Sequence, residues 1–425
     1  MLRTIDARTR KGKRELEELL DARRAFPDLP TLRRVLPIVE EILRKGRKPL
    51  ARFVRLFDRV SIPSKDLLVD PSRARRPPVD PAFARAFRLA VKRVRAYHTK
   101  QRPRGFSFTD GLGVRFAERP FPLDSVGVYV PGGRAFYPSS LLMGVVPARV
   151  AGVPRIVVAT PPKAYAGSAE LRWALRELGV REVLLAGGAH GIAGLVSVAH
   201  VAKIVGPGNR YVAAAKHLVS SVVAVDLPAG PSEVLIVASA DAPAGDVAAD
   251  LLAQAEHDPD AVCLLFTPSA PLVRKVLREV EKQLATLPTA KVARRALRRN
   301  GRAVVFGSLA DAFAAGLRVA AEHVQVMGTA AAKNGERLLP TAGALFLGSS
   351  TPTTFGDYVA GPNHVLPTGG AARSFSGLSL RDFVRWGRLV EMDARAARRL
   401  APAAAALARF EGLAAHERSA GRRKR

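Results

Sequence analysis

The chain has 425 residues, of which 48% are hydrophobic and 24% are charged, a balance typical of a globular protein too long for one ordinary core. No apolar run is long enough to cross a bilayer, and the first twenty residues contain no apolar signal-peptide core. We therefore expect no membrane association and a cytoplasmic location. The one cysteine, Cys263, excludes an internal disulfide and a thiolate zinc cage. Any bound metal must use His, Asp, Glu or amide oxygen.

The formal net charge of +30 raises the question of nucleic-acid binding. The basic excess lies mainly in the first hundred residues and in the C-terminal tail, which ends GRRKR. No zinc-finger pattern, aromatic RNA-binding signature or basic heptad region accompanies it. We interpret the charge as a solvated surface and expect no specific nucleic-acid partner.

The first third of the chain has helical patterns. Residues 1–25 carry charges at helical spacing and predict an N-terminal helical arm. The apolar spacing from Leu32 to Val60 predicts amphipathic helices, and another helix is expected from Ala82 to Tyr97.

The pattern changes near Ser125. Short β-branched runs such as VGVYV, RIVVAT and EVLLAGG alternate with Ala-rich helical segments, and a second such series begins at EVLIVAS, at Glu233. Strand–helix alternation at this spacing favours parallel sheets, so we predict an α/β protein with two doubly wound, Rossmann-like halves. A helical C-terminal tail, interrupted at Pro402 and Gly412, should follow Asp382. The predicted units are an arm (1–25), a first α/β domain (26–126 with 233–378), a second α/β domain (127–232) and a tail (379–425).

Glycines stand at three predicted strand ends, in VPGG (130–133), AGGAHG (186–191) and VGPGNRY (205–211). Glycine at a strand-to-helix turn lets the backbone approach a pyrophosphate. None of the turns completes the G-x-G-x-x-G pattern, although Asp226 lies at a suitable distance beyond the third to meet a ribose hydroxyl. These segments are interpreted either as a nucleotide-binding edge or as simple tight turns.

Polar side chains with catalytic or ligating chemistry occur in four places. Gln254 and His257 are three residues apart near a helix end, which places them on one face. Glu322-His323 supplies an adjacent carboxylate and imidazole suited to proton transfer. Taken singly, the first pair is better interpreted as a wetted helix end and the second as an ordinary helix-to-strand connection. The remaining candidates lie in a turn-rich loop, Asp357 and His364, and in the tail, Glu411 and His416.

Several long blocks agree together with one family. The chain resembles histidinol dehydrogenases, in order and spacing from about residue 38 to residue 416, through VGVYVPGGRAFYPSSLLMGVVPARVAGV, VGPGNRYVAAAKHLV, DLPAGPSEVL, LLAQAEHDPDA, AEHVQV, GDYVAGPNHVLPTGGAARSFSGLS and FEGLAAH. The resemblance implies an NAD-dependent, two-step oxidation of L-histidinol through L-histidinal to L-histidine, the last step of histidine biosynthesis.

The resemblance also implies roles for individual residues. One Zn²⁺ per subunit would be bound by Gln254, His257, Asp357 and His416, the last from the partner subunit of a homodimer with shared active sites. Glu322 and His323 would be the catalytic bases. In the predicted domains, the first would carry the catalytic and metal residues and the second the cofactor turns. Substrate contacts would come from Ser232, His323, His364, Glu411 and the four zinc ligands, and NAD contacts from Tyr129, His190 and Asn209.

Two positions depart from the family pattern. His190 stands where the family usually has glutamine, and Ala321 where it usually has proline. Neither change removes a predicted ligand or base. Three alternatives stay open from the residues: a related dehydrogenase for another primary alcohol, a non-catalytic binding or structural protein, and a nucleic-acid-binding protein.

Overall fold

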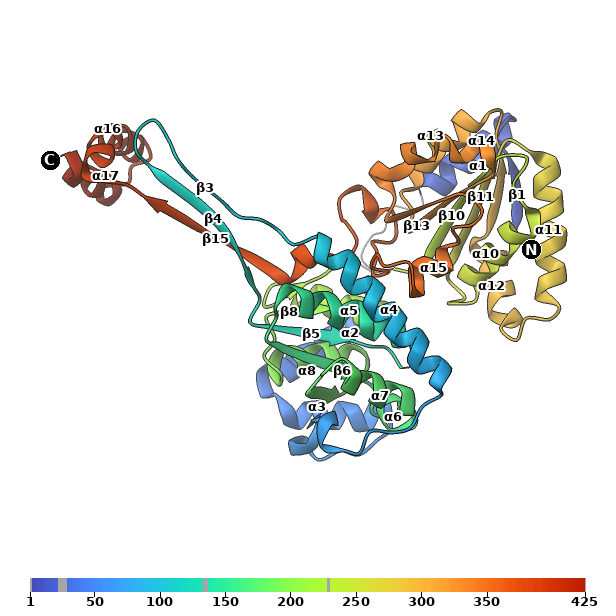
Figure 1. Cartoon of the computed structure of the whole chain (residues 1–425), viewed down its shortest axis with the longest axis horizontal. Helices are drawn as coiled ribbons and strands as arrows, with labels where there is room; N and C mark the ends of the chain where they lie inside the picture. Colours follow the sequence, from blue (N-terminus) through green and yellow to red (C-terminus); the bar gives the residue numbers. More distant parts are fainter. Residues whose placement is uncertain (1, 22–28, 133–136, 228–229, 425) are drawn as a thin grey trace.

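The computed structural model describes residues 2–21, 29–132, 137–227 and 230–424. They form two α/β units and a projecting arm (Figure 1). The α/β fold with two parallel sheets confirms the predicted fold class. No helix among the described residues is long and apolar enough to span a membrane.

The first unit is built on a six-stranded sheet, sheet I, in which all neighbouring strands are parallel. Its four central strands are rich in Val, Leu and Ile and are buried on both faces, as parallel sheets covered by helices require. In spatial order they are β1 (Arg3–Asp6), β12 (Arg302–Val305), β11 (Val262–Thr267), β10 (Glu233–Ala238), β13 (His323–Met327) and β14 (Ala344–Leu347).

Helices cover both faces of sheet I. Serine side chains start two of them: Ser269 accepts the Leu272 N–H and Ser308 the Asp311 N–H. One face packs against α10 (Ala244–Ala255), α11 (Ala270–Leu284) and α12 (Ala290–Asn300). The other packs against α1 (Arg10–Asp21), α13 (Leu309–Val319) and α14 (Thr329–Ala332).

The second unit is built on sheet II, which also has six strands. Five are parallel, and the short edge strand β2 runs antiparallel to β7. The spatial order is β2 (Leu68–Val69), β7 (Glu182–Leu185), β6 (Arg155–Thr160), β5 (Ser125–Tyr129), β8 (Lys203–Val205) and β9 (Ala224–Val225).

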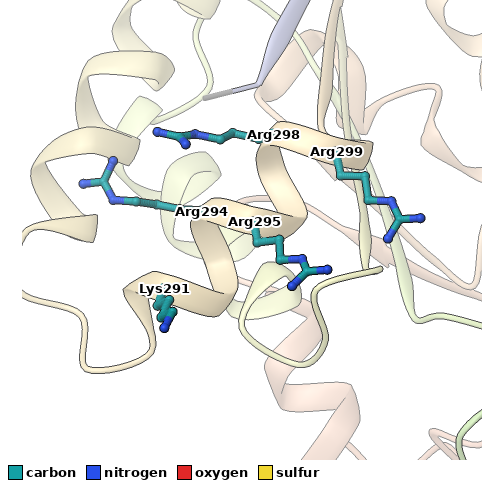
Figure 2. Close-up of a pocket in the computed structure, with 5 residues that line it drawn as sticks. All are labelled: Lys291, Arg294, Arg295, Arg298 and Arg299. Carbon is teal, nitrogen blue, oxygen red and sulfur yellow. The ribbon is translucent and has the colours of Figure 1, made fainter.

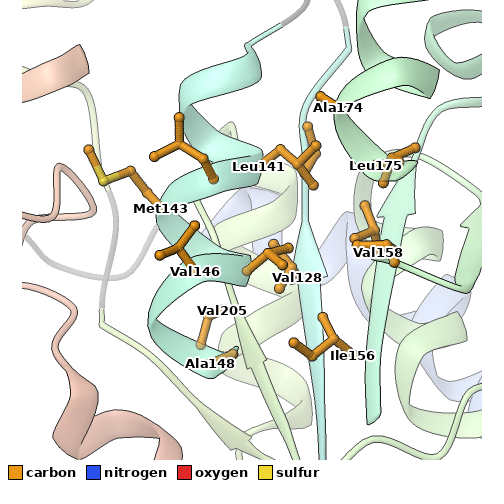
Figure 3. Close-up of a cluster of buried hydrophobic side chains, with 14 of the residues drawn as sticks. Val128, Leu141, Met143, Val146, Ala148, Ile156, Val158, Ala174, Leu175 and Val205 are labelled. Carbon is orange, nitrogen blue, oxygen red and sulfur yellow. The ribbon is translucent and has the colours of Figure 1, made fainter. Parts of the chain in front are cut away.

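Helices cover both faces of sheet II as well. Figure 3 shows one core, where Leu141 and Val146 lie near Val128. Gly144 lets the helix approach the sheet closely, because a Cβ there would lie 2.4 Å from Cγ1 of Val128. This face is covered by α4 (Pro81–Lys100), α5 (Pro138–Ala151) and α7 (Ala169–Glu177), and the other by α2 (Leu29–Lys45), α3 (Arg47–Phe53), α8 (Gly188–Ser197) and α9 (Arg210–Val219).

The structure corrects the predicted domain assignment in two places. The N-terminal arm is not purely helical, since β1 joins sheet I beside β12, and α1 packs on the same sheet. The described part of 26–126 does not belong with 233–378, because α2, α3 and α4 cover sheet II. Helical periodicity identifies the apolar face of α2, with Val35, Val39 and Ile42, but not the sheet that this face covers.

The arm consists of a three-stranded antiparallel sheet with α16 (Ala394–Phe410) and α17 (Ala414–Gly421) at its far end (Figure 1). The tail is therefore not wholly helical as predicted. Pro402 lies inside α16 without ending it, whereas Gly412, at φ 74°, separates the two helices. The strands are β3 (Phe106–Thr109), β4 (Arg115–Pro122) and β15 (Val384–Glu391).

Short elements complete the chain. The segments that connect sheet I to the arm matter most, because they carry several of the candidate site residues. The short elements of the whole chain are η1 (Val54–Asp58), η2 (Ser64–Asp66), η3 (Pro71–Arg73), α6 (Pro162–Gly167), η4 (Gly335–Thr341), α15 (Thr353–Tyr358), η5 (Ala371–Arg373), η6 (Leu380–Phe383) and η7 (Arg422–Lys424).

Candidate active site

Glu322 and His323 lie where β13 begins, between β10 and the edge strand β14 of sheet I. The preceding residue, Ala321, is buried, and its carbonyl oxygen accepts the Gly343 N–H at 3.0 Å. Only 6% of Glu322 and 5% of His323 is exposed, so both polar side chains are held in a largely water-free environment. Buried polar groups need partners, and theirs come from two neighbouring segments.

Glu233, at the start of the adjacent strand β10, is the first partner. The Glu233 N–H donates to Oε2 of Glu322 at 2.8 Å, and the Glu322 N–H donates to Oε2 of Glu233 at 3.4 Å. Oε1 of Glu233 also accepts the Gly369 N–H at 3.0 Å. Sequence reasoning missed Glu233, because a lone glutamate before the apolar run VLIVA gives no signal of its own.

His323 lies among carboxylates. Its Nδ1 is 3.3 Å from the Glu233 carbonyl oxygen and 3.6 Å from Oε2 of Glu322, and its Nε2 is 3.3 Å from Oδ1 of Asp357. Burial alone would lower the pKa of His323, but the negative charges of Glu322 and Asp357 outweigh it and raise that pKa well above the ordinary value. Nε2 is nevertheless buried without a well-aligned hydrogen bond from any described residue.

Asp357 comes from α15. Burial would raise its pKa, but the hydrogen bond and charge of His323, with the charges of His364 and His257, lower it instead. His364 donates from Nδ1 to the Asp357 carbonyl oxygen at 2.9 Å, and burial lowers the pKa of His364. Asp357, His364 and His323 therefore meet in one place.

The second unit holds this loop. Arg93 of α4 donates to the carbonyl oxygens of Val359 and Ala360. Asn363 donates from Nδ2 to the Met143 carbonyl oxygen at 2.8 Å, and its Nδ2 lies 3.4 Å from Nε2 of the buried His98. Figure 1 shows α15 on the side of the first unit that faces the second. The candidate site thus lies between the two units.

Gln254 and His257 occupy the end of α10. Gln254 is 5% exposed, His257 lies exposed just beyond the helix, and the charge of His257 acts on Asp357. Ser232 precedes β10 and its carbonyl accepts the Val262 N–H at 3.0 Å, next to Glu233. These residues share the amino-terminal edge of sheet I with Glu322 and His323.

Glu411 and His416 are not brought to this site within one chain. Glu411 caps α16 and His416 lies on α17; both are exposed at the far end of the arm, well away from α15 (Figure 1). Accordingly, the described residues contain no group of three or more His, Cys, Asp or Glu side chains placed to hold a metal ion.

The glycine turns lie at the carboxyl-terminal edge of sheet II. Tyr129 ends β5, and its hydroxyl oxygen accepts the Gly188 N–H at 2.9 Å. Burial, with the charge of Asp58, raises the pKa of Tyr129. His190, on α8, lies in the same turn, with its Nε2 2.7 Å from Oδ2 of Asp58. Part of the VPGG turn falls outside the described residues.

Asn209 begins α9 after the neighbouring strand β8. Its side-chain oxygen accepts the N–H groups of Tyr211 and Val212 at 3.0 and 3.2 Å, so the exposed amide nitrogen is the part left for a ligand. Asp226 does not face a ligand, contrary to the sequence interpretation. Its side chain is 1% exposed, pairs with Lys216 at 2.6 Å and accepts the Gly206 N–H at 2.8 Å.

Comparison with known proteins gives consistent results. Residues 23–424 match the family model described as histidinol dehydrogenase. The chain is 43% identical over 392 residues to a histidinol dehydrogenase of Bradyrhizobium diazoefficiens, covering 91% of each chain. It is 42% identical over 416 residues to that of Mesorhizobium japonicum, covering 96% of this chain and 93% of the other.

Solved structures agree with the sequence comparison. The crystal structure of a histidinol dehydrogenase from Elizabethkingia anophelis superposes with a TM-score of 0.87 at 30% identity, covering 99% of this chain and 98% of that one. An acetylating aldehyde dehydrogenase from Geobacillus thermoglucosidasius, at 13% identity and a TM-score of 0.50, shares the fold alone.

Proposed function

Because the chain belongs to the histidinol dehydrogenase family, we propose that it oxidises L-histidinol through L-histidinal to L-histidine, with NAD as hydride acceptor. The observation that carries this proposal is the buried Glu322–His323 pair, which faces Asp357 between the two α/β units. In its neutral form the His323 imidazole accepts a proton, and the flanking carboxylates stabilise the imidazolium that forms. The cytoplasmic location expected from the sequence is part of the proposal.

Gln254, His257, Asp357 and His416 of the partner subunit are the proposed ligands of one Zn²⁺. These oxygen and nitrogen donors fit zinc, and His257 and Asp357 lie close enough for their charges to interact. Nε2 of His323 is buried beside Asp357 without a well-aligned hydrogen-bond partner among the described residues. This supports the proposal that a ligand binds at this place. When bound, zinc supplies a Lewis acid that orients the substrate.

The protein's own groups then move protons in both steps. In the first, His323 accepts the hydroxyl proton while hydride leaves the hydroxymethyl carbon for NAD. L-Histidinal must add water before it can give up a second hydride, and Glu322 accepts the proton of that water. His323 accepts the hydroxyl proton again in the second oxidation. In sum, one alcohol, one water and two NAD⁺ give one carboxylate, two NADH and three protons.

The carboxyl-terminal edge of sheet II is the proposed NAD site, with Tyr129, His190 and Asn209 as contacts. Support comes from the turns after β5, β7 and β8, which lie at the same edge of the sheet. β8 is a neighbour of β5, and only β6 lies between β5 and β7. Glycine at 206 is needed there, because its φ is 118° and a Cβ would lie 2.3 Å from the Tyr129 carbonyl oxygen. Ligands of open α/β sheets bind at this edge.

A two-fold homodimer is the proposed assembly. The arm carries Glu411 and His416 away from the Asp357 of their own chain, and Phe410 beside them is 91% exposed. Leu389, Val390 and Leu407 of the arm are exposed as well, and apolar side chains gathered in this way are usually covered by a partner. In this dimer each chain places its arm against the other chain, which gives closed two-fold symmetry. Each site then contains Ser232 and His364 from one chain and Glu411 from the other.

The test is NADH formation from L-histidinol by the full chain. We expect two NADH for each L-histidine, and loss of activity with a zinc chelator followed by recovery with added zinc. The absence of NADH formation with L-histidinol, while another primary alcohol supports it, would overturn the proposed substrate.

A further inference from the structure

Asp58 connects the N-terminal helices of the second unit to the proposed cofactor edge. It is the last residue of η1, and Arg59 after it is left-handed, with φ 56°. The Asp58 side chain is 11% exposed and that of His190 is 4% exposed. Oδ2 of Asp58 meets Nε2 of His190 at 2.7 Å and accepts the Gly187 N–H at 3.1 Å. An N-terminal carboxylate therefore supports the turn after β7.

These contacts fix the protonation of the imidazole. Oδ2 of the Asp58 carboxylate only accepts hydrogen bonds, from the Gly187 N–H and from His190, so Nε2 of His190 carries the hydrogen that it shares with Oδ2. Nδ1 is then the ring nitrogen left to contact a ligand, and no hydrogen bond from the described part of the chain reaches it. Phe57 stacks on the ring, with centroids 5.7 Å apart and an interplanar angle of 29°. Both the tautomer and the plane of His190 are thus held by η1.

The N–H groups of Gly187 and Gly188, at the start of α8, are occupied by side chains of the protein itself. Gly187 donates to Asp58, and Gly188 donates to the Tyr129 hydroxyl. The turn must be glycine at position 187, because a Cβ there would lie 2.7 Å from Oδ1 of Asp58. A cofactor that approaches this edge therefore meets the side chains of Tyr129 and His190, while the N–H groups of Gly187 and Gly188 are already occupied.

We propose that Asp58 is a positioning residue for the cofactor, which holds Nε2–H of His190 so that Nδ1 faces the NAD site. This inference rests on the proposed function, since it takes NAD as the ligand of that edge. The family's usual glutamine carries a donor and an acceptor on one amide and needs no tautomer to be set. With histidine at position 190, the contact depends on Asp58.

A double-mutant cycle on NAD binding tests this dependence. The dissociation constant for NAD is measured by calorimetry for the wild-type protein, Asp58→Asn, His190→Gln and the double variant. We expect Asp58→Asn to weaken NAD binding about tenfold, as loss of one oriented hydrogen bond does. In the His190→Gln background the same change should cost less than about twofold, because the glutamine amide has a fixed donor and a fixed acceptor and needs no tautomer to be set. Equal losses in both backgrounds would overturn the proposal, since Asp58 would then act through the turn alone.

Three further measurements separate the proposed role of Asp58 from other effects on NAD binding. Asp66→Asn, on the exposed turn η2, should leave NAD binding unchanged. The kcat for L-histidinol at saturating NAD should change less than about twofold in Asp58→Asn, which separates a binding effect from a loss of catalysis. If Asp58→Asn does not fold, His190→Phe keeps the stacking on Phe57 without ring nitrogens and should show the tenfold loss; unchanged NAD binding would overturn the proposal. Wild-type protein that fails to oxidise L-histidinol counts against the proposed function, whatever the cycle shows.

Discussion

At the scale of single residues, the site is organised by two glutamates on neighbouring strands. Glu233 and Glu322 each accept the backbone N–H of the other residue, at 3.4 and 2.8 Å. The Glu322 carboxylate is therefore fixed beside His323, and Glu233 ties the Gly369 segment to the same place. No sequence motif links Glu233 to Glu322 or to Asp357, because both lie far from it in the chain. Its role becomes visible only in the structure, where β10 pairs with β13.

The proposed division of labour between Glu322 and His323 predicts separable effects. Glu322→Gln keeps an oxygen to accept the Glu233 N–H but cannot take a proton from water. It should slow oxidation of L-histidinal about 100-fold while slowing oxidation of L-histidinol much less. His323→Ala should slow both oxidations at least as strongly. Steady-state NADH formation from each substrate checks this, and equal slowing of both oxidations by Glu322→Gln would contradict the assignment.

The zinc proposal predicts a linked loss of metal and activity. His257→Ala removes one proposed ligand from an exposed position, so the fold should tolerate it. Bound zinc, measured by atomic emission after desalting, should fall well below one per subunit, and activity should fall with it. His217→Ala, a histidine of α9 outside the site, is the matched control. Full zinc content and normal turnover in His257→Ala would exclude His257 as a ligand.

At the scale of elements, the sequence predicted the parts with strong periodicity. The strand runs from VGVYV to ALFLG and the helices between them are present, because both faces of a parallel sheet select continuous apolar runs. The arm strands β4 and β15 were missed, since most of their residues are exposed and show no alternation between buried and solvated positions. The predicted site residues of each unit gather at one edge of its sheet, whereas Glu411 and His416 lie on the arm, apart from both sheets.

The turn after β8 depends on a buried ion pair. Lys216 and Asp226 are 5% and 1% exposed in their side chains, lie 2.6 Å apart, and both hold Gly206. Asp226→Ala leaves a buried ammonium without its counter-charge and should lower the free energy of unfolding by about 3 kcal/mol. Urea denaturation of the wild type and the variant measures this, with Asp66→Asn as an exposed control expected within about 0.5 kcal/mol of wild type. A loss below about 1 kcal/mol in Asp226→Ala would show that the pair does not support the turn.

At the scale of the whole molecule, the arm is the feature on which the proposed dimer rests. The eight-residue strand β4 alone spans about 26 Å at 3.3 Å per residue, so α17 lies far from its own Asp357. Exposed apolar side chains gather along the arm, among them Phe108, Val390 and Phe410. A monomer would leave them in water and the proposed zinc site incomplete.

Subunit mixing tests the shared site. His323→Ala and His416→Ala should each be inactive as homodimers. After dissociation and reassembly, a mixed dimer contains one site with both changes and one with neither, so activity should return toward about a quarter of the wild-type value for random pairing, with half of the dimers mixed and one intact site in each. A mixture that stays inactive although mixed dimers are demonstrated by mass would show that His416 acts within its own chain.

The basic surface predicts a different behaviour. Figure 2 shows a surface hollow lined by cations of α12, namely Lys291, Arg294, Arg295, Arg298 and Arg299. Binding of duplex DNA should be detectable at low salt and fall steeply as salt rises, because it depends on counterion release. Fluorescence anisotropy with two unrelated DNA sequences measures it. Tight, sequence-selective binding at physiological salt would contradict our interpretation of the +30 charge as a solvated surface.

The pairing of β1 with β12 has a consequence for how the chain folds during synthesis. Arg3–Asp6 has its only described strand partner at Arg302–Val305, almost three hundred residues later. At a translation rate of 5–20 residues per second, this interval lasts about 15–60 s. Sheet II is complete by Val225, before any other strand of sheet I has been made. The second unit can therefore fold on the ribosome while β1 and the apolar face of α1 stay unpaired and exposed until sheet I is made.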